Sequence, residues 1–164
     1  MAKPTPGFLA ILQLLREHEV DFIAVGGICA VLHGAPIATF DLELVRWRQP
    51  YNIDRLLMAL ETLDAHYRDP AFRGRKPNTS HLSSAGHPLL IKSFGLLDLP
   101  GAIGAGHDYE DLHDQTSEME VSTGLTARVL SLSALIKSKE ETTGEKDRAA
   151  LPTLRRTLEE QSKI

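Results

Sequence analysis

A short apolar run closed by a glycine pair, and followed within twenty residues by a segment of alternating polarity, is the feature that most constrains this chain. The run, residues 20–25 (VDFIAV), predicts a buried strand, because it is short, β-branched and ended by Gly26 and Gly27. Residues 28–33 (ICAVLH) are apolar and precede a glycine, which predicts a short helix. The sequence therefore predicts a strand, a glycine pair and a helix in this order.

Residues 39–45 (TFDLELV) change the period, since polar and apolar side chains alternate there. Successive side chains of a strand point to opposite faces, so the polar ones share a face. They are Thr39, Asp41 and Glu43. Two carboxylates about 6 to 7 Å apart repel by roughly 0.6 kcal/mol in water and about 2.5 kcal/mol at an effective dielectric of 20. A solvated strand face explains the pair, and a cleft that holds a cation is the alternative.

The rest of the chain predicts further helices and strands without a repeat or a linker. Helices are expected over residues 6–20 and 52–67, the second with Asn52 as N-cap, and two more over 132–161 with a break near Gly144; strand pairs are expected around Gly95 and Gly124. A chain of 164 residues is long enough for one core. We therefore predict a single domain over residues 1–164, of the α+β (mixed α/β) class, with a mixed β-sheet flanked by helices.

The composition of the chain limits the kinds of partner, compartment and metal site that can be expected. A net charge of −4, from 18 basic and 22 acidic side chains, gives no global positive field for nucleic acid. Apolar stretches fall far short of the roughly 18 residues that span a membrane, so no membrane partner is expected. Cys29 is the only cysteine, which fits a reducing, cytoplasmic compartment. Among the seven histidines, the pairs His81 with His87 and His107 with His113 are six residues apart, a spacing that does not favour a zinc site on a helix.

Residues 68–87 carry no periodicity and exceed the usual length of a structureless connection, so they predict a mobile loop. The loop's charges are Arg68, Arg73, Arg75 and Lys76 against Asp69. This local excess of +3 favours RNA or another anionic acceptor, although a solvated loop explains it as well.

Residues 25–44 together resemble the signature of the nucleotidyltransferase superfamily related to polymerase beta, in its minimal and AbiEii-like branch associated with toxin and antitoxin systems. That signature is a strand, a glycine pair or Gly-Ser, a short helix, and then Asp-x-Asp or Asp-x-Glu. Residues 94–104 (FGLLDLPGAIG) resemble the later strand that carries a third acidic residue, here Asp98. Residues 135–151 resemble the helical Lys and Lys-Asp motif of the same superfamily.

The resemblance implies a nucleotidyltransferase-like fold and a Mg²⁺-dependent transfer of NMP from an NTP to an acceptor hydroxyl. The acceptor would be an RNA or tRNA end or a protein, and the chain would be a toxin with an antitoxin protein as its partner. Two Mg²⁺ ions would be held by Asp41, Glu43 and Asp98, with Asp98 also serving as the base. Gly26 and Gly27 would cradle the triphosphate.

The resemblance also gives roles to four polar residues. Thr39 would hydrogen-bond a phosphate or fix Asp41. Lys139 and Lys146 would meet the negative charge that develops on the phosphates. Asp147 would orient Lys146 or cap the last helix.

Three positions depart from the pattern. Glu43 stands where a second Asp is commonest, and Ile37 and Gly144 stand where relatives often have arginine. A longer carboxylate changes metal–oxygen distances, and a lost arginine removes a bidentate phosphate donor. The alternative function is therefore a catalytically inactive nucleotidyltransferase-fold protein with a binding or regulatory role.

Overall fold

The computed structural model describes residues 6–67, 75–83, 89–92 and 95–163. Its elements, in chain order, are α1 (Pro6–Glu17), β1 (Phe22–Val25), α2 (Gly26–Leu32), β2 (Asp41–Arg46), α3 (Pro50–Thr62), β3 (His66–Tyr67), α4 (Thr79–Ser83), β4 (Leu89–Lys92), β5 (Gly95–Asp98), β6 (Ala102–Ile103), β7 (His107–Asp108), α5 (Tyr109–Leu112), the 3-10 helix η2 (His113–Gln115), β8 (Thr116–Ser122), β9 (Leu125–Leu130), α6 (Leu132–Glu140) and α7 (Glu145–Gln161). None of the helices described is both long and apolar enough to span a membrane.

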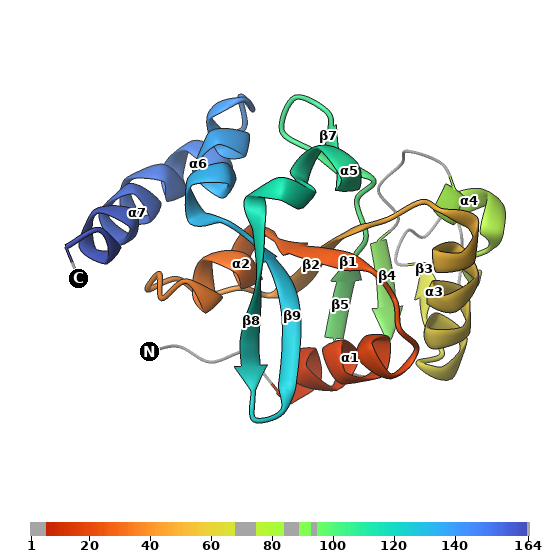
Figure 1. The fold of residues 1–164 in the computed structure, drawn as a ribbon. Helices are drawn as coiled ribbons and strands as arrows, with labels where there is room; N and C mark the ends of the chain where they lie inside the picture. Colours follow the sequence, from red (N-terminus) through yellow and green to blue (C-terminus); the bar gives the residue numbers. More distant parts are fainter. Residues whose placement is uncertain (1–5, 68–74, 84–88, 93–94, 164) are drawn as a thin grey trace.

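Seven strands form one mixed sheet in the order β3-β4-β5-β2-β1-β9-β8, and β6 pairs with β7 separately (Figure 1). In the sheet's centre, β1 runs antiparallel to β2 and parallel to β9, and β2 runs parallel to β5. The predicted strand pairs around Gly95 and Gly124 are confirmed as the antiparallel pairs β4–β5 and β8–β9. The predicted mixed sheet flanked by helices is confirmed as well.

The helices bury the faces that their periodicity predicts. Phe8, Ile11, Leu12 and Leu15 of α1 are all buried in the core, and so are Ile53, Leu56 and Leu60 of α3. α6 and α7 are separate helices, with Gly144 as the N-cap of α7, which confirms the predicted break. The same core includes side chains of the four central strands, so the helices hold β1, β2, β5 and β9 in fixed positions.

The prediction of Asn52 as an N-cap is wrong. α3 begins at Pro50, with Gln49 as its N-cap, because proline suits the first helical position. Asn52 is instead fully buried. Its side-chain oxygen accepts from the Asp21 backbone N–H at 2.7 Å, and its amide donates to the carbonyls of Asp21 at 2.9 Å and Trp47 at 2.8 Å. Asn52 thus ties the entry of β1 to the exit of β2.

The helix predicted to reach Tyr67 ends at Thr62, since Asp64 adopts a left-handed backbone with φ of 52° and the chain then enters β3. Phe40 precedes β2 and is 82% exposed, so the alternation over residues 39–45 does not bury every apolar side chain.

The predicted loop over residues 68–87 is only partly described. Residues 79–83 form the helix α4 and its Leu82 is buried, so the loop prediction is wrong for these five residues. Residues 68–74 and 84–88 lie outside the described residues, and with them Arg68, Asp69, Arg73 and His87.

Candidate active site

Three carboxylates meet where β2 and β5 pair. Glu43 lies opposite Asp98 in the register of these parallel strands, and Asp41 lies opposite Leu96. One oxygen from each of Asp41, Glu43 and Asp98 lies within 4.8 Å of the others. In the described part of the chain, this acidic triad is the only group of three or more acidic, histidine or cysteine side chains that could hold a metal ion. Such a convergence of oxygens suits a hard divalent cation.

Burial and mutual repulsion make the triad electrostatically unfavourable by itself. Burial, then the charges of Asp98 and Asp41, raise the pKa of Glu43, while Lys139 opposes the rise. Burial and the Asp41 charge raise the pKa of Asp98 to about 6, against the opposing influence of a nearby guanidinium and a backbone hydrogen bond. Oδ1 of Asp98 is buried and has no hydrogen-bond partner among the described residues. An orphaned carboxylate oxygen of this kind needs a cation or a proton.

The glycine pair gives space to the polar face of β2. Gly26 begins α2 with φ of 62°, and a Cβ on it would lie 2.6 Å from Oε2 of Glu43. A Cβ on Gly27 would lie 2.7 Å from Cβ of Thr39. The Thr39 hydroxyl donates to the backbone oxygen of Asp41 at 3.0 Å, so it positions the start of β2. Each glycine therefore admits one of the residues that the sequence analysis selected.

A cavity of about 220 Å³ opens beside the triad. Glu43 and Asp98 line it from the sheet, and Gly26 lines it from the start of α2. Gly104 lines it from the turn between β6 and β7, and Lys139 from α6. This β6–β7 hairpin was not predicted. Its signal in the sequence was the pair of glycines at 104 and 106, and in the structure both have positive φ. The hairpin lies against α6, where Nε2 of His107 is 3.0 Å from Oε2 of Glu141.

The two predicted lysines occupy different places. Lys139 lines the cavity, and its Nζ lies 3.0 Å from Oδ1 of Asp147. Lys146 is exposed on α7 and does not line the cavity, although its charge acts to lower the pKa of Glu43. Asp147 was expected to orient Lys146 or to cap the last helix. It instead bonds Lys139 and accepts from the Thr142 hydroxyl at 2.7 Å, and the N-cap of α7 is Gly144. Burial acts to raise the pKa of Asp147, but these hydrogen bonds outweigh it and the pKa is lowered.

Arg46 is a buried cation that the sequence analysis missed. It is 1% exposed at the end of β2, and its guanidinium donates to the backbone oxygens of Leu82, at 2.8 Å, and Leu99. Burial lowers the pKa of Arg46 to about 10, and the guanidinium in turn acts to lower the pKa of Asp98. The available signal was a basic residue directly after the apolar pair Leu44 and Val45, at the end of the predicted strand. Arg46 links α4 to the end of β5, where the third carboxylate stands.

Three further positions named in the sequence analysis are Cys29, Ile37 and Gly144. Cys29 is fully buried, its thiol donates to the Leu130 oxygen at 3.1 Å, and burial raises its pKa, which does not suit a nucleophile. Ile37 packs against the core. Gly144 lies close to the site, since a Cβ there would be 3.7 Å from Oδ2 of Asp147.

No protein-family model and no curated protein matches this sequence. Solved structures do match over nearly the whole chain. Lincosamide antibiotic adenylyltransferase LnuA, bound to lincomycin, superposes with a TM-score of 0.62 at 16% identity, over 94% of this chain and 98% of that one. The antibiotic-resistance factor ANT(2'')-Ia, studied in solution, gives 0.59 at 16% identity, over 93% and 82%. A protein from Thermotoga maritima assigned as a nucleotidyltransferase, TM1012, gives 0.57 at 16% identity, over 93% and 91%.

At 16% sequence identity, these matches are evidence for the fold alone, and all three agree on the same fold. The coverage of both chains shows that the likeness extends over most of the sequence rather than over one motif. This chain therefore has the fold of the nucleotidyltransferase superfamily.

Proposed function

We propose that this protein is a Mg²⁺-dependent nucleotidyltransferase, which moves NMP from an NTP to an acceptor hydroxyl. The observation that carries the proposal is the acidic triad, whose oxygens lie within 4.8 Å of one another beside a glycine pair. The fold shared with adenylyltransferase structures supports it. We also propose a cytoplasmic location, because a single cysteine fits a reducing compartment.

The residues present fit a divalent cation. Asp41, Glu43 and Asp98 would hold it, since Mg²⁺ prefers carboxylate oxygens and the orphaned oxygen of Asp98 lacks any other partner among the described residues. When bound, such ions neutralise charge on the phosphates and on the attacking and leaving oxygens.

The chain's own groups would position the reactants. Gly26 and Gly27 let the backbone approach a triphosphate, and Lys139 supplies a cation on the facing wall of the cavity. Thr39 keeps Asp41 in place through its backbone. Lys146, at the surface, would meet the outer phosphates.

In the transfer step, the acceptor oxygen forms a bond to the α-phosphorus and the bond from that phosphorus to the β-bridging oxygen breaks. Pyrophosphate leaves with the electron pair. The hydroxyl proton passes to the Asp98 carboxylate, the base that the sequence resemblance implies.

The acceptor is open to three classes. An RNA or tRNA end and a protein hydroxyl follow from the sequence resemblance, which also suggests a toxin with an antitoxin partner. A small hydroxylated antibiotic follows from LnuA and ANT(2'')-Ia, described as an adenylyltransferase and a resistance factor. In the toxin case, expression of the wild type would arrest growth and the Asp41→Asn variant would not.

Incubation of the purified chain with α-labelled NTPs and Mg²⁺, in separate arms with RNA, extract protein and lincomycin, tests the proposal. We expect label in one arm, lost in Asp41→Asn and kept in Glu120→Gln, which removes an exposed carboxylate of β8 away from the site. Calorimetry with NTP and Mg²⁺ provides the second readout. Absence of binding there would overturn the proposal and favour the inactive binding or regulatory protein instead.

Position 43 separates a weakened enzyme from an inactive relative. Glu43→Asp restores the shorter carboxylate that is commoner at this place, and more turnover in this variant would indicate an active but poorly matched site. No turnover in either form would favour the regulatory function.

A further inference from the structure

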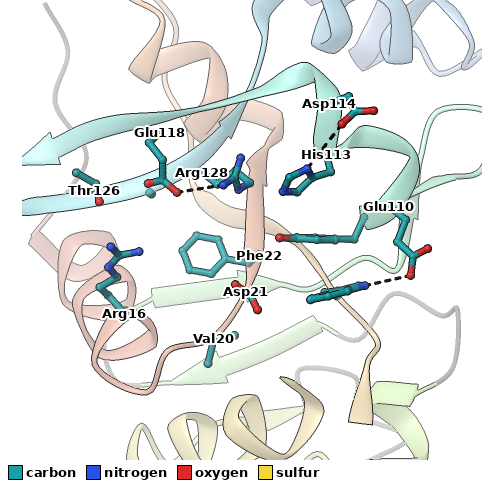
Figure 2. A pocket seen from close by; sticks show the side chains of 13 residues that line it. Arg16, Val20, Asp21, Phe22, Glu110, His113, Asp114, Glu118, Thr126 and Arg128 are labelled. Atoms are coloured by element: carbon teal, nitrogen blue, oxygen red, sulfur yellow. Dashed lines mark hydrogen bonds and ion pairs between the residues drawn. The ribbon is translucent and has the colours of Figure 1, made fainter. Parts of the chain in front are cut away.

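A second cavity, of about 460 Å³ against 220 Å³ at the triad, lies at the other end of β1 (Figure 2). Its lining comes from α1, the start of β1, Trp47 just after β2, the α5 region, β8 and β9. Phe22 lines it, and Phe22 pairs with Arg46, whereas Val25 pairs with Glu43 of the triad. The two pairs are three residue steps apart along β1, a span of about 10 Å. This cavity is therefore distinct from the proposed nucleotide site.

The inner wall of the second cavity is apolar and aromatic. Val20, Phe22 and Ala127 are buried there. Tyr109 is also buried and stacks on Trp47, with ring centroids 5.1 Å apart and an interplanar angle of 16°. Aromatic faces bind cations as well as apolar groups, so the wall suits a ligand that combines the two.

The charges of the lining are mostly acidic. Its four carboxylates are Asp21, Glu110, Asp114 and Glu118, and its two guanidinium groups are Arg16 and Arg128, which leaves −2 with His113 neutral. Arg128 is already neutralised, because it lies 3.5 Å from Glu118 and donates to Thr116 at 2.9 Å. Arg16 is exposed. The field inside the cavity therefore favours a cation over an anion.

Two inner polar groups have free bonding capacity. Asp21 accepts from the Tyr51 hydroxyl through Oδ2, at 3.2 Å, while its Oδ1 bonds none of the described residues. The Tyr109 hydroxyl likewise bonds none of them, although the residue is only 7% exposed. Burial and the Asp21 charge raise the pKa of Tyr109, with Arg128 opposing, so the phenol lies in the negative field of Asp21. A carboxylate oxygen and a phenol oxygen together are acceptors for an ammonium group.

We infer that this cavity binds a small organic ammonium ion. Its ammonium donates to Oδ1 of Asp21 and to the Tyr109 oxygen, and its hydrocarbon body packs on Phe22 and the ring stack. The volume is within the range of small-molecule sites. This inference is independent of the proposed nucleotidyl transfer, because it uses no residue of the triad.

The only tryptophan of the chain, Trp47, lines the cavity and so reports on its occupancy. The full chain is titrated with 2-phenylethylamine, 2-phenylethanol and phenylacetate, which share one hydrocarbon body and differ in charge. We expect a saturable change of Trp47 fluorescence with the amine, and affinity at least about tenfold weaker for the alcohol and the acid, which lack the charge-assisted bond.

Variants test whether the amine binds through a bond to Asp21 or only through nonspecific apolar contact. Asp21→Asn, which still accepts from Tyr51, is expected to weaken amine binding at least about tenfold. The matched control Asp54→Asn removes an exposed carboxylate of α3 that does not line the cavity, and should leave the affinity unchanged. Tyr109→Phe should weaken binding less and keep the preference for the amine. Asp41→Asn should bind the amine like the wild type, even if no nucleotide transfer is ever found.

Circular dichroism melting confirms that each variant is folded. If Asp21→Asn fails to fold, Tyr109→Phe and the three-ligand comparison still decide the matter. An equal response to amine and alcohol, or unchanged affinity in Asp21→Asn, overturns the inference. So does the lack of a saturable response to 2-phenylethylamine, cyclohexylamine and spermidine up to about 10 mM, a concentration that would detect even millimolar affinity.

Discussion

The carboxylate of Glu43 occupies the space that a side chain on Gly26 would fill, because a Cβ at that glycine would lie 2.6 Å from Oε2. The first glycine of the pair is thus required by its neighbour on β2 as well as by its own left-handed backbone. One residue of the helix start and one of the adjacent strand form a single steric unit. Variants at Gly26 test this unit directly.

Gly26→Ala is expected to lower the free energy of unfolding by about 1–2 kcal/mol from the positive φ alone. The added methyl group also displaces Glu43 from the triad, so Mg²⁺ affinity and any nucleotidyl transfer should fall together. Urea unfolding and Mg²⁺ calorimetry measure the two effects.

Gly34→Ala is the control for that strain. Gly34 has φ of 91°, and a Cβ there would meet nothing within 4 Å. This variant should lose similar stability and keep its Mg²⁺ affinity. Loss of Mg²⁺ affinity in both variants would mean that backbone strain, and not Glu43, accounts for the effect.

Asp98→Asn should stabilise the metal-free chain at pH 7, because it removes a charge whose pKa burial and Asp41 raise to about 6. We expect a gain of about 1 kcal/mol, allowing for the screening of a partly exposed group by water. In the same variant, the rise in melting temperature that Mg²⁺ gives to the wild type should disappear. A Mg²⁺ response equal to that of the wild type would exclude Asp98 as a ligand.

The stability of the metal-free wild type should fall as pH rises from about 4 to about 6. The pKa of Asp98 is raised from 3.8 to about 6, so across this window the folded chain keeps a proton that the unfolded chain has lost. The folded state then binds more protons, and the free energy of unfolding decreases with pH. The difference between wild type and Asp98→Asn in urea unfolding isolates this contribution; a difference that does not vary with pH would contradict it.

Asp147→Ala should destabilise the chain by about 1–2 kcal/mol, because Lys139 and Thr142 both lose a hydrogen-bond partner. Glu145→Ala serves as the control, since it removes an acidic residue from the same first turn of α7 and only its interaction with the helix dipole, about 0.3–0.5 kcal/mol. Equal losses in urea unfolding would show that the link to Lys139 contributes nothing.

Asn52→Asp should destabilise the chain by about 3 kcal/mol or more, because a buried carboxylate cannot donate to the carbonyls of Asp21 and Trp47. Asn78→Asp makes the same chemical change at an exposed site where the side chain only accepts, from the His81 backbone N–H. It should have the stability of the wild type. A mild effect at residue 52 would show that water replaces the lost donor.

Local patterns predicted the part of the site that lies on one strand. Alternation placed Asp41 and Glu43 on a shared face because the period of a strand is set by covalent geometry. The glycine pair and the strand before it were equally local. The arrival of Asp98 beside Glu43 joins residues 55 positions apart, and only the resemblance to a known superfamily linked them.

The features that were missed depend on tertiary contacts. Asn52 has the residue type of an N-cap, yet its partners are backbone groups at Asp21 and Trp47, which no local pattern reveals. Asp147 was expected to orient Lys146, its neighbour in the sequence. Its actual partner is Lys139, which lies on the other side of the break between α6 and α7. The second cavity is formed by six separate segments and has no signature in any one of them.

β2 is hydrogen-bonded along both of its edges, by β1 on one side and by β5 on the other. Whether a residue of β2 occupies an odd or an even position therefore decides which face of the sheet its side chain lies on, and this parity cannot change without loss of the pairing. One residue inserted between Asp41 and Val45 would turn the acids upstream of it to the sheet's opposite side, and sliding the strand to compensate would break two ladders at once. Insertions in the stretch from 34 to 38, which is neither helix nor strand, would leave that parity untouched.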